Sequence, residues 1–288
     1  MSRWQFWIDR GGTFTDVVAR KPDGTIVTHK LLSENPERYR DAALAGIRAL
    51  LNVPAGKPIP GEHIEAVKMG TTVATNALLE RKGEPTVLFI TRGFRDALRI
   101  AYQNRPRLFE RHIVLPEMLY TRVVEVEERV GARGDLVLPL NAERAKRDLQ
   151  AAYAEGFRSV AIVFMHGYRY TEHEQKVAEL AEQVGFPQIS VSYRVSPLMK
   201  FVGRGDTTVV DAYLSPILRR YVNQVASELE GVRLFFMQSN GGLADADDDG
   251  ALRLRGEFAC LEGEDLVLGA GDRAGNGDGV SHARSLSV

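Results

Sequence analysis

The sequence predicts an α/β fold in which opening antiparallel strands lead into a mixed sheet flanked by helices. Residues 4–31 contain three short apolar or β-branched runs separated by turn residues, which is typical of antiparallel strands. From residue 36 to residue 237, helical periodicity alternates with short buried strands. That alternation is an α/β pattern. Hydrophobic residues make up 44% of the chain, enough to form cores.

Length and composition restrict the class of protein. The 288 residues suit one large or two modest domains. Lys and Arg number 37 against 38 for Asp and Glu, so no basic surface for nucleic acid is expected. Cys260 is the only cysteine, which excludes a disulfide framework. No apolar run reaches the ~18 residues of a membrane-spanning helix, so we expect a soluble cytoplasmic protein with no membrane partner.

A glycine-rich turn over residues 9–16 follows the first predicted strand. It carries two glycines, two threonines and two aspartates: Gly11, Gly12, Thr13, Thr15, Asp9 and Asp16. Glycines let a ligand approach the backbone closely, and successive amide groups form an anion-binding concavity. The hydroxyls add donors, and the carboxylates offer hard oxygens of the kind that hold Mg²⁺. The alternative is a tight hairpin with incidental glycines, which needs neither the threonines nor the aspartates.

This Asp-x-Gly-Gly-Thr-x-Thr-Asp pattern resembles the first phosphate loop of the actin-like ATPase superfamily, whose fold is ribonuclease H-like. A Walker loop is excluded, because no Gly-Lys-Ser/Thr sequence occurs in the chain. The resemblance implies that the chain binds ATP and Mg²⁺. It also implies residue roles: Asp9 would hold Mg²⁺ directly or through water, and the phosphate would be cradled by Gly11, Gly12, Thr13 and Thr15.

A second informative stretch covers residues 67–83. A strand is predicted to end at Gly70, and a helix to run from about Thr72 to Lys82 with Gly83 as the residue that ends it. Ordinary capping of the helix by Thr71 or Thr72 is a sufficient local explanation. Free N–H groups at a helix start also favour anions. Four polar side chains on an otherwise apolar helix also suggest a cleft wall: Thr71, Thr72, Thr75 and Asn76.

Two further helix starts are predicted from capping patterns. Asn35 followed by Pro36 predicts a helix that continues through Leu51, where apolar residues recur at helical spacing. Thr171 with Glu174 three residues later is a capping box for a helix through residue 184.

The run from Met69 to Gly83, Met-Gly-Thr-Thr-Val-Ala-Thr-Asn-Ala-Leu-Leu-Glu-Arg-Lys-Gly, resembles a signature of the hydantoinase/oxoprolinase family. Arg10 and Met69 favour the oxoprolinase branch, because hydantoinase relatives more often have an apolar residue and a histidine there. The resemblance implies a small-molecule lactam substrate, 5-oxo-L-proline, which is hydrolysed to L-glutamate with ATP cleavage. Residues 70–76 would line the cleft. The alternatives are an ATP-dependent hydantoinase or a related carboxylase subunit.

Residues 102–106 break helical periodicity and concentrate amide and guanidinium groups. An arginine beside amides can bind a carboxylate bidentately. Asn104 and Arg105 are therefore predicted substrate contacts, with a solvated loop as the alternative.

The resemblance divides the chain into three parts. Residues 1–204 would be the family's N-terminal domain, and residues 205–244 the truncated start of its catalytic A domain. Residues 245–288 are rich in Gly, Asp and Arg without amphipathic period, which predicts a frameshifted or disordered tail. Only one Asp-x-Gly-Gly-Thr copy is present, whereas actin-like ATPases bind nucleotide between two domains. A non-catalytic fragment is thus a further hypothesis. An active protein would need the C-terminal portion or a partner subunit, and we expect a homo-oligomer when complete.

Overall fold

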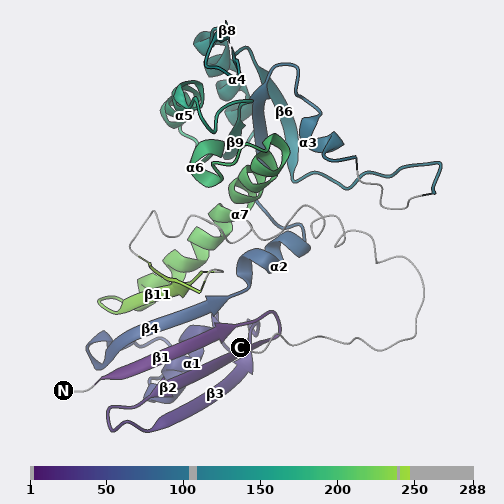
Figure 1. Cartoon of the computed structure of the whole chain (residues 1–288). Coiled ribbons are helices and arrows are strands. Elements are labelled where there is room, and N and C mark those ends of the chain that lie inside the picture. Colours follow the sequence, from purple (N-terminus) through teal and green to yellow (C-terminus); the bar gives the residue numbers. More distant parts are fainter. Residues whose placement is uncertain (1–2, 104–108, 239–240, 247–288) are drawn as a thin grey trace.

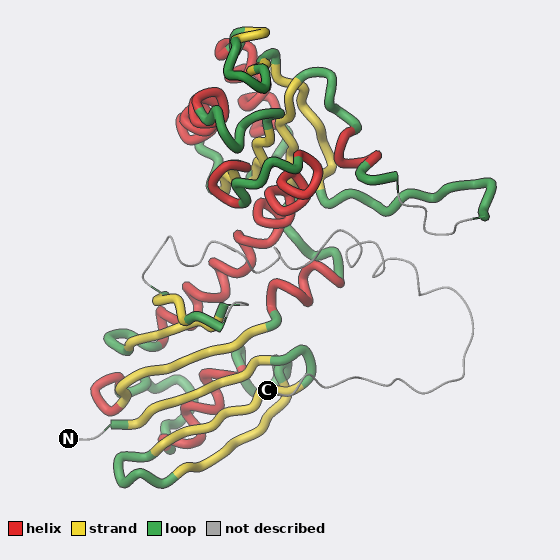
Figure 2. The backbone as a smooth tube through the Cα atoms, viewed as in Figure 1, coloured by secondary structure: helices red, strands yellow, loops and turns green. Residues whose placement is uncertain are grey.

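The structure is a computed structural model that describes residues 3–103, 109–238 and 241–246. It has two lobes, each built on its own sheet, and one long helix, α7 (Phe201–Glu228), runs through both (Figure 1). Strands and flanking helices alternate along the described chain, so the α/β prediction is confirmed (Figure 2). Among the described residues, no helix combines the length and apolar character needed to cross a membrane.

The first lobe contains a six-stranded mixed sheet in the order β12-β11-β4-β1-β2-β3. Its strands are β1 (Trp4–Arg10), β2 (Phe14–Arg20), β3 (Ile26–Leu32), β4 (Ile64–Thr71), β11 (Arg233–Met237) and β12 (Leu243–Asp245). The first three strands pair antiparallel, as predicted. β4 runs parallel to both β1 and β11, so these three strands share one direction.

One face of this sheet forms the first core. Alternation in β1 and β2 directs Phe6, Ile8, Val17 and Ala19 to that face, where all four are buried. Helix α1 (Ala42–Leu51) and the C-terminal half of α7 cover the same face. Each fully buried aliphatic or aromatic side chain stabilises the fold by roughly 1.5–3 kcal/mol. This energy favours the pairing that turns the apolar residues of β1 and β2 toward the core, and the residues between them then point to the opposite face.

The second lobe contains a four-stranded parallel sheet in the order β10-β9-β5-β6. The strands are β5 (Thr86–Thr91), β6 (Tyr120–Val126), β9 (Ser159–Val163) and β10 (Gln188–Val191). The helices are α3 (Ala97–Ile100), α4 (Ala142–Ala154), α5 (Glu172–Val184) and α6 (Ser192–Val195). β5 and β9 are buried along their whole length, which is expected for central parallel strands with helices on both faces. A small hairpin, β7 (Arg129–Val130) and β8 (Leu136–Leu138), completes the lobe.

Helix α7 belongs to both cores. Val209 and Ala212 pack with the second sheet, whereas Leu218 and Val222, further along the helix, pack with the first. Pro216 lies between these halves and has no N–H group, so the carbonyl of Ala212 lacks its helical partner. The Ser159 hydroxyl of β9 donates to that carbonyl at 2.5 Å. A residue of the second sheet therefore supplies the hydrogen bond that the Ala212 carbonyl lacks within the helix.

The predicted helix start at Asn35 is wrong. α1 begins at Ala42, and its N-cap is Asp41, whose side chain accepts a hydrogen bond from the Leu44 amide at 3.0 Å. The Asn35 carbonyl accepts only the turn hydrogen bonds of Arg38 and Tyr39. A buried carboxylate cap outcompetes the Asn-Pro start, since Asp41 also contacts Arg10 of β1.

The predicted end of the second-stretch helix also needs correction. Helix α2 is Val73–Leu79, shorter than predicted, and Arg81 adopts the left-handed conformation that ends it. Gly83 is required for a different reason, because a Cβ there would lie 2.0 Å from the Tyr213 ring on α7. The segment that leads from α2 into the second lobe thus lies directly against α7.

The capping box at Thr171 and Glu174 does not form. Thr171 precedes α5, but its side chain makes no capping hydrogen bond. Glu174 is fully buried and accepts hydrogen bonds from the Phe164 amide at 2.7 Å and the Ser192 hydroxyl at 2.6 Å. The carboxylate therefore joins α5 to β9 and α6, and the local pattern is overridden by packing.

We predict that Gly83→Ala destabilises the protein. The added methyl group would overlap the Tyr213 ring, and overpacking of this kind costs about 1–3 kcal/mol. Thermal unfolding would show a lowered midpoint. Gly203→Ala is the matched control: it lies inside α7, where the one described atom within 4 Å of the added Cβ is the Tyr102 hydroxyl at 3.5 Å. Alanine is favoured over glycine within a helix, so a loss of stability in the control, or none in Gly83→Ala, would contradict this packing.

A second prediction concerns pH. Burial raises the pKa of Asp206, on α7, from 3.8 to about 7. The folded protein therefore holds this proton more tightly than the unfolded chain. The stabilisation is complete below about pH 4 and is lost as the pH rises through 7. Asp206→Asn cannot ionise, so its free energy of unfolding relative to wild type should rise by on the order of 1–2 kcal/mol between pH 4 and pH 8.

Denaturant unfolding at the two pH values measures this difference. Burial also raises the pKa of Glu174 to about 7, but Glu174 is present in both proteins and its contribution cancels in the comparison. A pH-independent difference would show that Asp206 is ionised normally in the folded state.

Candidate functional site

Three parallel strands of the first sheet end at the same edge. β1 ends at Arg10, β4 ends at Thr71 and β11 ends at Met237. In open α/β sheets, ligands bind outside the carboxyl ends of the strands. The glycine-rich turn follows β1 and helix α2 follows β4, so both stretches singled out from the sequence reach this edge.

The turn itself is shorter than the sequence pattern. Asp9 pairs with Asp16, and Arg10 with Thr15, within the β1–β2 ladder. Only residues 11–13 lie outside the strands. Ser33 holds this loop from below, since its hydroxyl donates to the Gly11 carbonyl at 2.7 Å and its amide donates to the Thr13 carbonyl at 2.9 Å.

The top of the loop is open. Gly12 and Thr13 are exposed, and their amide N–H groups donate to no residue within the described chain. Unpaired amides on an exposed glycine turn are the groups that bind an anion. The loop geometry therefore suits a phosphate.

Thr15 does not face this opening. It is fully buried, and its hydroxyl lies 2.9 Å from the Ser33 hydroxyl. Alternation along β2 places Thr15 on the core side with Val17. Its contact with Ser33 makes Thr15 a support of the loop, while Asp16, on the exposed face, pairs with Lys30 at 2.9 Å.

The structure brings the second stretch against the loop. The Thr72 amide and hydroxyl donate to the Arg10 carbonyl at 3.1 and 3.3 Å. The Asn76 amide nitrogen donates to the Thr72 hydroxyl at 3.3 Å. A Cβ on Gly12 would lie 3.2 Å from that Asn76 nitrogen. Gly12 therefore lies close to α2, and a side chain at this position would crowd Asn76.

The other predicted cleft residues surround this contact. Thr71 accepts a hydrogen bond from the Val73 amide at 3.3 Å, and Thr75 is exposed on α2. Asp9 and Gly70 are neighbours in the β1–β4 ladder. A Cβ on Gly70 would lie 3.6 Å from Asp9 Oδ1 and 3.4 Å from Met237 Cε. Gly70 thus leaves room beside an exposed carboxylate at the strand ends.

Asp41 and Tyr221 adjoin the site but were not anticipated. The Arg10 guanidinium lies 5.0 Å from the centre of the Tyr221 ring, and Arg10 Nε lies 3.7 Å from Asp41 Oδ2. Arg10 continues the inward alternation of Phe6 and Ile8. The alternation could have indicated that the Arg10 side chain faces the core and therefore needs charged or aromatic partners. The sequence does not indicate that Asp41 and Tyr221 are those partners.

Some predictions fall on residues that the structure does not describe. Asn104 and Arg105 lie outside the described residues, so their assignment as substrate contacts stays a prediction. The predicted tail also lies outside them from residue 247 onward. In the part of the chain that is described, no group of three or more His, Cys, Asp or Glu side chains is arranged to hold a metal ion.

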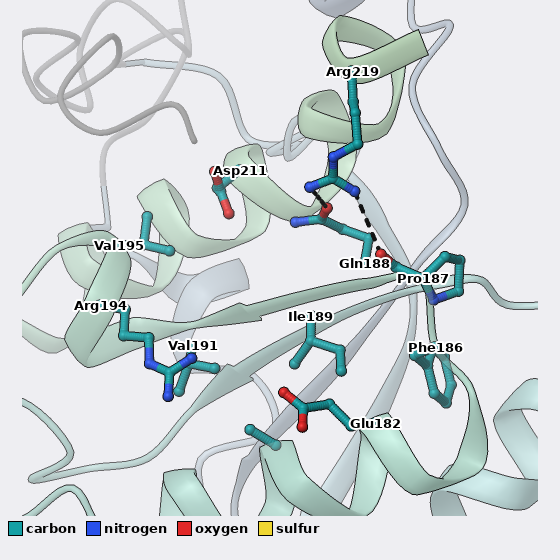
Figure 3. A pocket seen from close by; sticks show the side chains of 11 residues that line it. Glu182, Phe186, Pro187, Gln188, Ile189, Val191, Arg194, Val195, Asp211 and Arg219 are labelled. Carbon is teal, nitrogen blue, oxygen red and sulfur yellow. Dashed lines mark hydrogen bonds between the residues drawn. The ribbon is translucent and has the colours of Figure 1, made fainter. Parts of the chain in front are cut away.

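A separate cavity of about 210 Å³ lies in the second lobe along β10, between α5 and α7 (Figure 3). Several of its polar groups are already hydrogen-bonded. Arg219 donates to the Gln188 side chain at 3.1 Å, and Asp211 accepts hydrogen bonds from the Ser190 and Ser215 hydroxyls at 2.5 and 2.9 Å. We therefore place the candidate site at the edge of the first sheet and assign no ligand to this cavity.

Comparison with known proteins shows which family the chain resembles. The profile described as "Hydantoinase/oxoprolinase N-terminal region" matches residues 5–185, and the profile "Hydantoinase/oxoprolinase" matches residues 204–252. The 5-oxoprolinase of Dictyostelium discoideum is 40% identical over 84% of this chain, and 5-oxoprolinase 1 of Arabidopsis thaliana is 40% identical over 90% of it. The chain spans about 22% of the length of each of these relatives.

A solved structure is also similar. The ATP-dependent caprolactamase from Pseudomonas jessenii superposes with a TM-score of 0.71 at 28% identity, over 84% of this chain and 36% of that protein. This likeness confirms the actin-like fold that the sequence predicts. With a profile match over most of its length, the chain belongs to the hydantoinase/oxoprolinase family.

Proposed function

We propose that this chain is the N-terminal part of an ATP-dependent 5-oxoprolinase and supplies one wall of its nucleotide site. The observation that carries the proposal is the contact between the open glycine loop and α2, centred on Gly12 and Asn76. Identity of about 40% to two 5-oxoprolinases supports the choice of reaction. The substrate would be a small-molecule lactam, 5-oxo-L-proline.

The residue roles follow from exposure and hydrogen bonding. The amides of Gly11, Gly12 and Thr13 form the loop, and the two without partners, those of Gly12 and Thr13, would contact phosphate oxygens. Thr15 supports the loop through Ser33. The neighbouring wall, which would face the rest of the nucleotide or the lactam, consists of Gly70, Thr71, Thr72, Thr75 and Asn76.

A bound Mg²⁺ would neutralise phosphate charge. The donor set fits this ion, because Asp9 offers an exposed carboxylate beside the space left by Gly70. Mg²⁺ usually keeps several waters and takes one or two protein carboxylates. Asp9 would therefore hold the ion directly or through water.

The chemistry explains why ATP would be required. An unstrained lactam is a poor electrophile. Transfer of the γ-phosphoryl group to the lactam oxygen would release ADP and leave an activated imidate, whose carbon water can attack. The ring nitrogen would then leave with a proton, which gives the acyl phosphate of glutamate. A second water would hydrolyse this acyl phosphate to L-glutamate and inorganic phosphate. Phosphoryl transfer of this kind depends on positioning and on charge stabilisation, and those are what the loop and Asp9 would provide.

A second candidate keeps the nucleotide chemistry and changes the substrate to a hydantoin or another lactam. The observation that favours this second candidate is the structural likeness to an ATP-dependent caprolactamase. Phosphate release in a full-length context, measured with 5-oxoproline and with hydantoins in parallel, separates the two.

We predict that Gly12→Val abolishes ATP-dependent turnover in a full-length context. The valine would occupy the space where phosphate approaches and would crowd Asn76. The backbone N–H groups remain, but phosphate could no longer reach them, and loss of one such donor contact typically lowers kcat by about 10²–10³. Thr28→Val is a matched control, since Thr28 is an exposed position on β3 of the same sheet. Steady-state ADP release measures both, and unchanged turnover in Gly12→Val would remove the phosphate-loop assignment.

We also predict that the 288-residue chain alone does not hydrolyse 5-oxoproline. It contains one phosphate loop, and catalysis requires further donors that converge on the charge of the transition state. An open loop in bulk solvent binds phosphate weakly. Coupled ADP release with and without 5-oxoproline at saturating Mg²⁺ tests this. Substrate-dependent turnover of about 1 s⁻¹ or more, a rate typical of enzymes, would show that the site is complete within this chain.

A further inference from the structure

Arg10 is a charged residue at a core-facing position, and the phosphate chemistry described above does not use its side chain. We propose that Arg10 is a positioning residue that couples the loop at residues 11–13 to helix α7, through Asp41 and Tyr221. The effect of this coupling on nucleotide binding rests on the proposed function, whereas the effect of Arg10 on the position of the loop does not.

The side chain of Arg10 lies where three elements meet. It is 16% exposed, and the Asp41 side chain is 2% exposed. Asp41 contacts Arg10 through one carboxylate oxygen and caps α1 through the other. The guanidinium stacks on Tyr221 of α7, and Tyr221 packs edge-on against Phe236 of β11. One side chain thus connects β1 with α1 and α7.

The main chain of Arg10 forms the base of the loop. Its carbonyl accepts both hydrogen bonds from Thr72, and Gly11 follows directly. A shift of the Arg10 side chain would therefore move the loop and the start of α2 together. Because α7 packs on both sheets, the loop position and the arrangement of the two lobes are linked through this residue.

The cluster is poorly arranged as a device for stability alone. Arg10 Nε is buried and has no hydrogen-bond partner among the described residues, since Asp41 Oδ2 lies 3.7 Å away, and the Tyr221 hydroxyl is buried beside Asp41. Burial raises the pKa of Tyr221, so its phenol stays neutral. Replacing a buried ion pair with uncharged residues of similar volume is often neutral for stability. Arg10→Met combined with Asp41→Asn should remove the charges while the asparagine still caps α1.

Amide hydrogen exchange in the 288-residue chain, without nucleotide, tests the coupling. Three protected amides report on the loop and its contacts: Gly11, Ser33 and Thr72. In the Arg10→Met/Asp41→Asn variant we expect their exchange to rise at least 10-fold, with the thermal midpoint nearly unchanged. The Phe164 amide, bonded to Glu174 in the second lobe, should exchange as in wild type. Tyr221→Leu should give the same local increase, and combining all three changes should add little.

Arg48→Met is the matched control. Arg48 also joins α1 to α7, through Glu228 at 2.9 Å, and has a similar side-chain exposure of 18%. The hydrogen bonds that Arg48 makes within the described chain go to Pro54, Lys57 and Glu228 and not to the loop, so exchange at the three reporter amides should not change. Unchanged loop exchange in the Arg10→Met/Asp41→Asn variant, or an equal increase in both lobes, would overturn the inference.

Nucleotide binding is measured separately. In a full-length context the Arg10→Met/Asp41→Asn variant should raise the KM for ATP more than it lowers kcat, because it disturbs the loop and leaves the phosphate-contacting amides in place. If wild type does not bind ATP, the proposed function fails while the exchange result still stands.

Discussion

The packing of α7 against two sheets is the interaction on which the rest of the structure depends. Its first turn is fixed by Arg204, which is fully buried and donates to the Ser192 hydroxyl at 2.9 Å and to the Phe164 carbonyl at 2.6 Å. The guanidinium also lies beside the buried carboxylate of Glu174. The far half of the helix covers the first sheet. Without α7, the two lobes would be joined only by the segment after α2.

This arrangement also explains how the site is assembled. β1 and β4 are distant in the sequence but parallel in the sheet, so the glycine loop and the start of α2 meet at one edge. The contact leaves little room for a side chain at Gly12, and the start of α2 donates directly to the Arg10 carbonyl. The side chains that stabilise the site lie one layer below, in Ser33 and Asp41. The exposed parts of the site are therefore supported by buried hydrogen bonds.

Much of the first lobe could be predicted from the sequence. The hairpin of β1–β3 was predictable because alternation and turn residues are local signals. The glycine turn was predictable because adjacent glycines between two strand-like runs are a local turn signal. The start of α1 was not, since the capping strength of Asp41 depends on its burial beside Arg10. Glu174 misled for the same reason: a local capping pattern cannot show that a carboxylate faces a core.

Which site residues are buried and which are exposed could be predicted from the sequence, but the partners of the buried ones could not. Period-two alternation places Thr15 inward and Asp9 outward, and this could have been read from the hairpin. The partners of inward polar residues could not, because Tyr221 and Ser33 come from elements far along the chain or across a turn. Gly83 shows the same limit, as the reason for a glycine there is an aromatic ring on α7.

The position of β11 in the first sheet has a consequence for how the chain folds. β11 pairs with β4, and the residues of the second lobe lie between these two strands in the sequence. Closing so long a loop costs conformational entropy, and non-local pairing slows folding. The second sheet, in contrast, forms from a continuous stretch, residues 86–191. We expect the inserted lobe to become ordered before β11 joins the first sheet. The folded lobe and α7 would then bring β11 next to β4, so the sheet edge that carries the candidate site would be completed last.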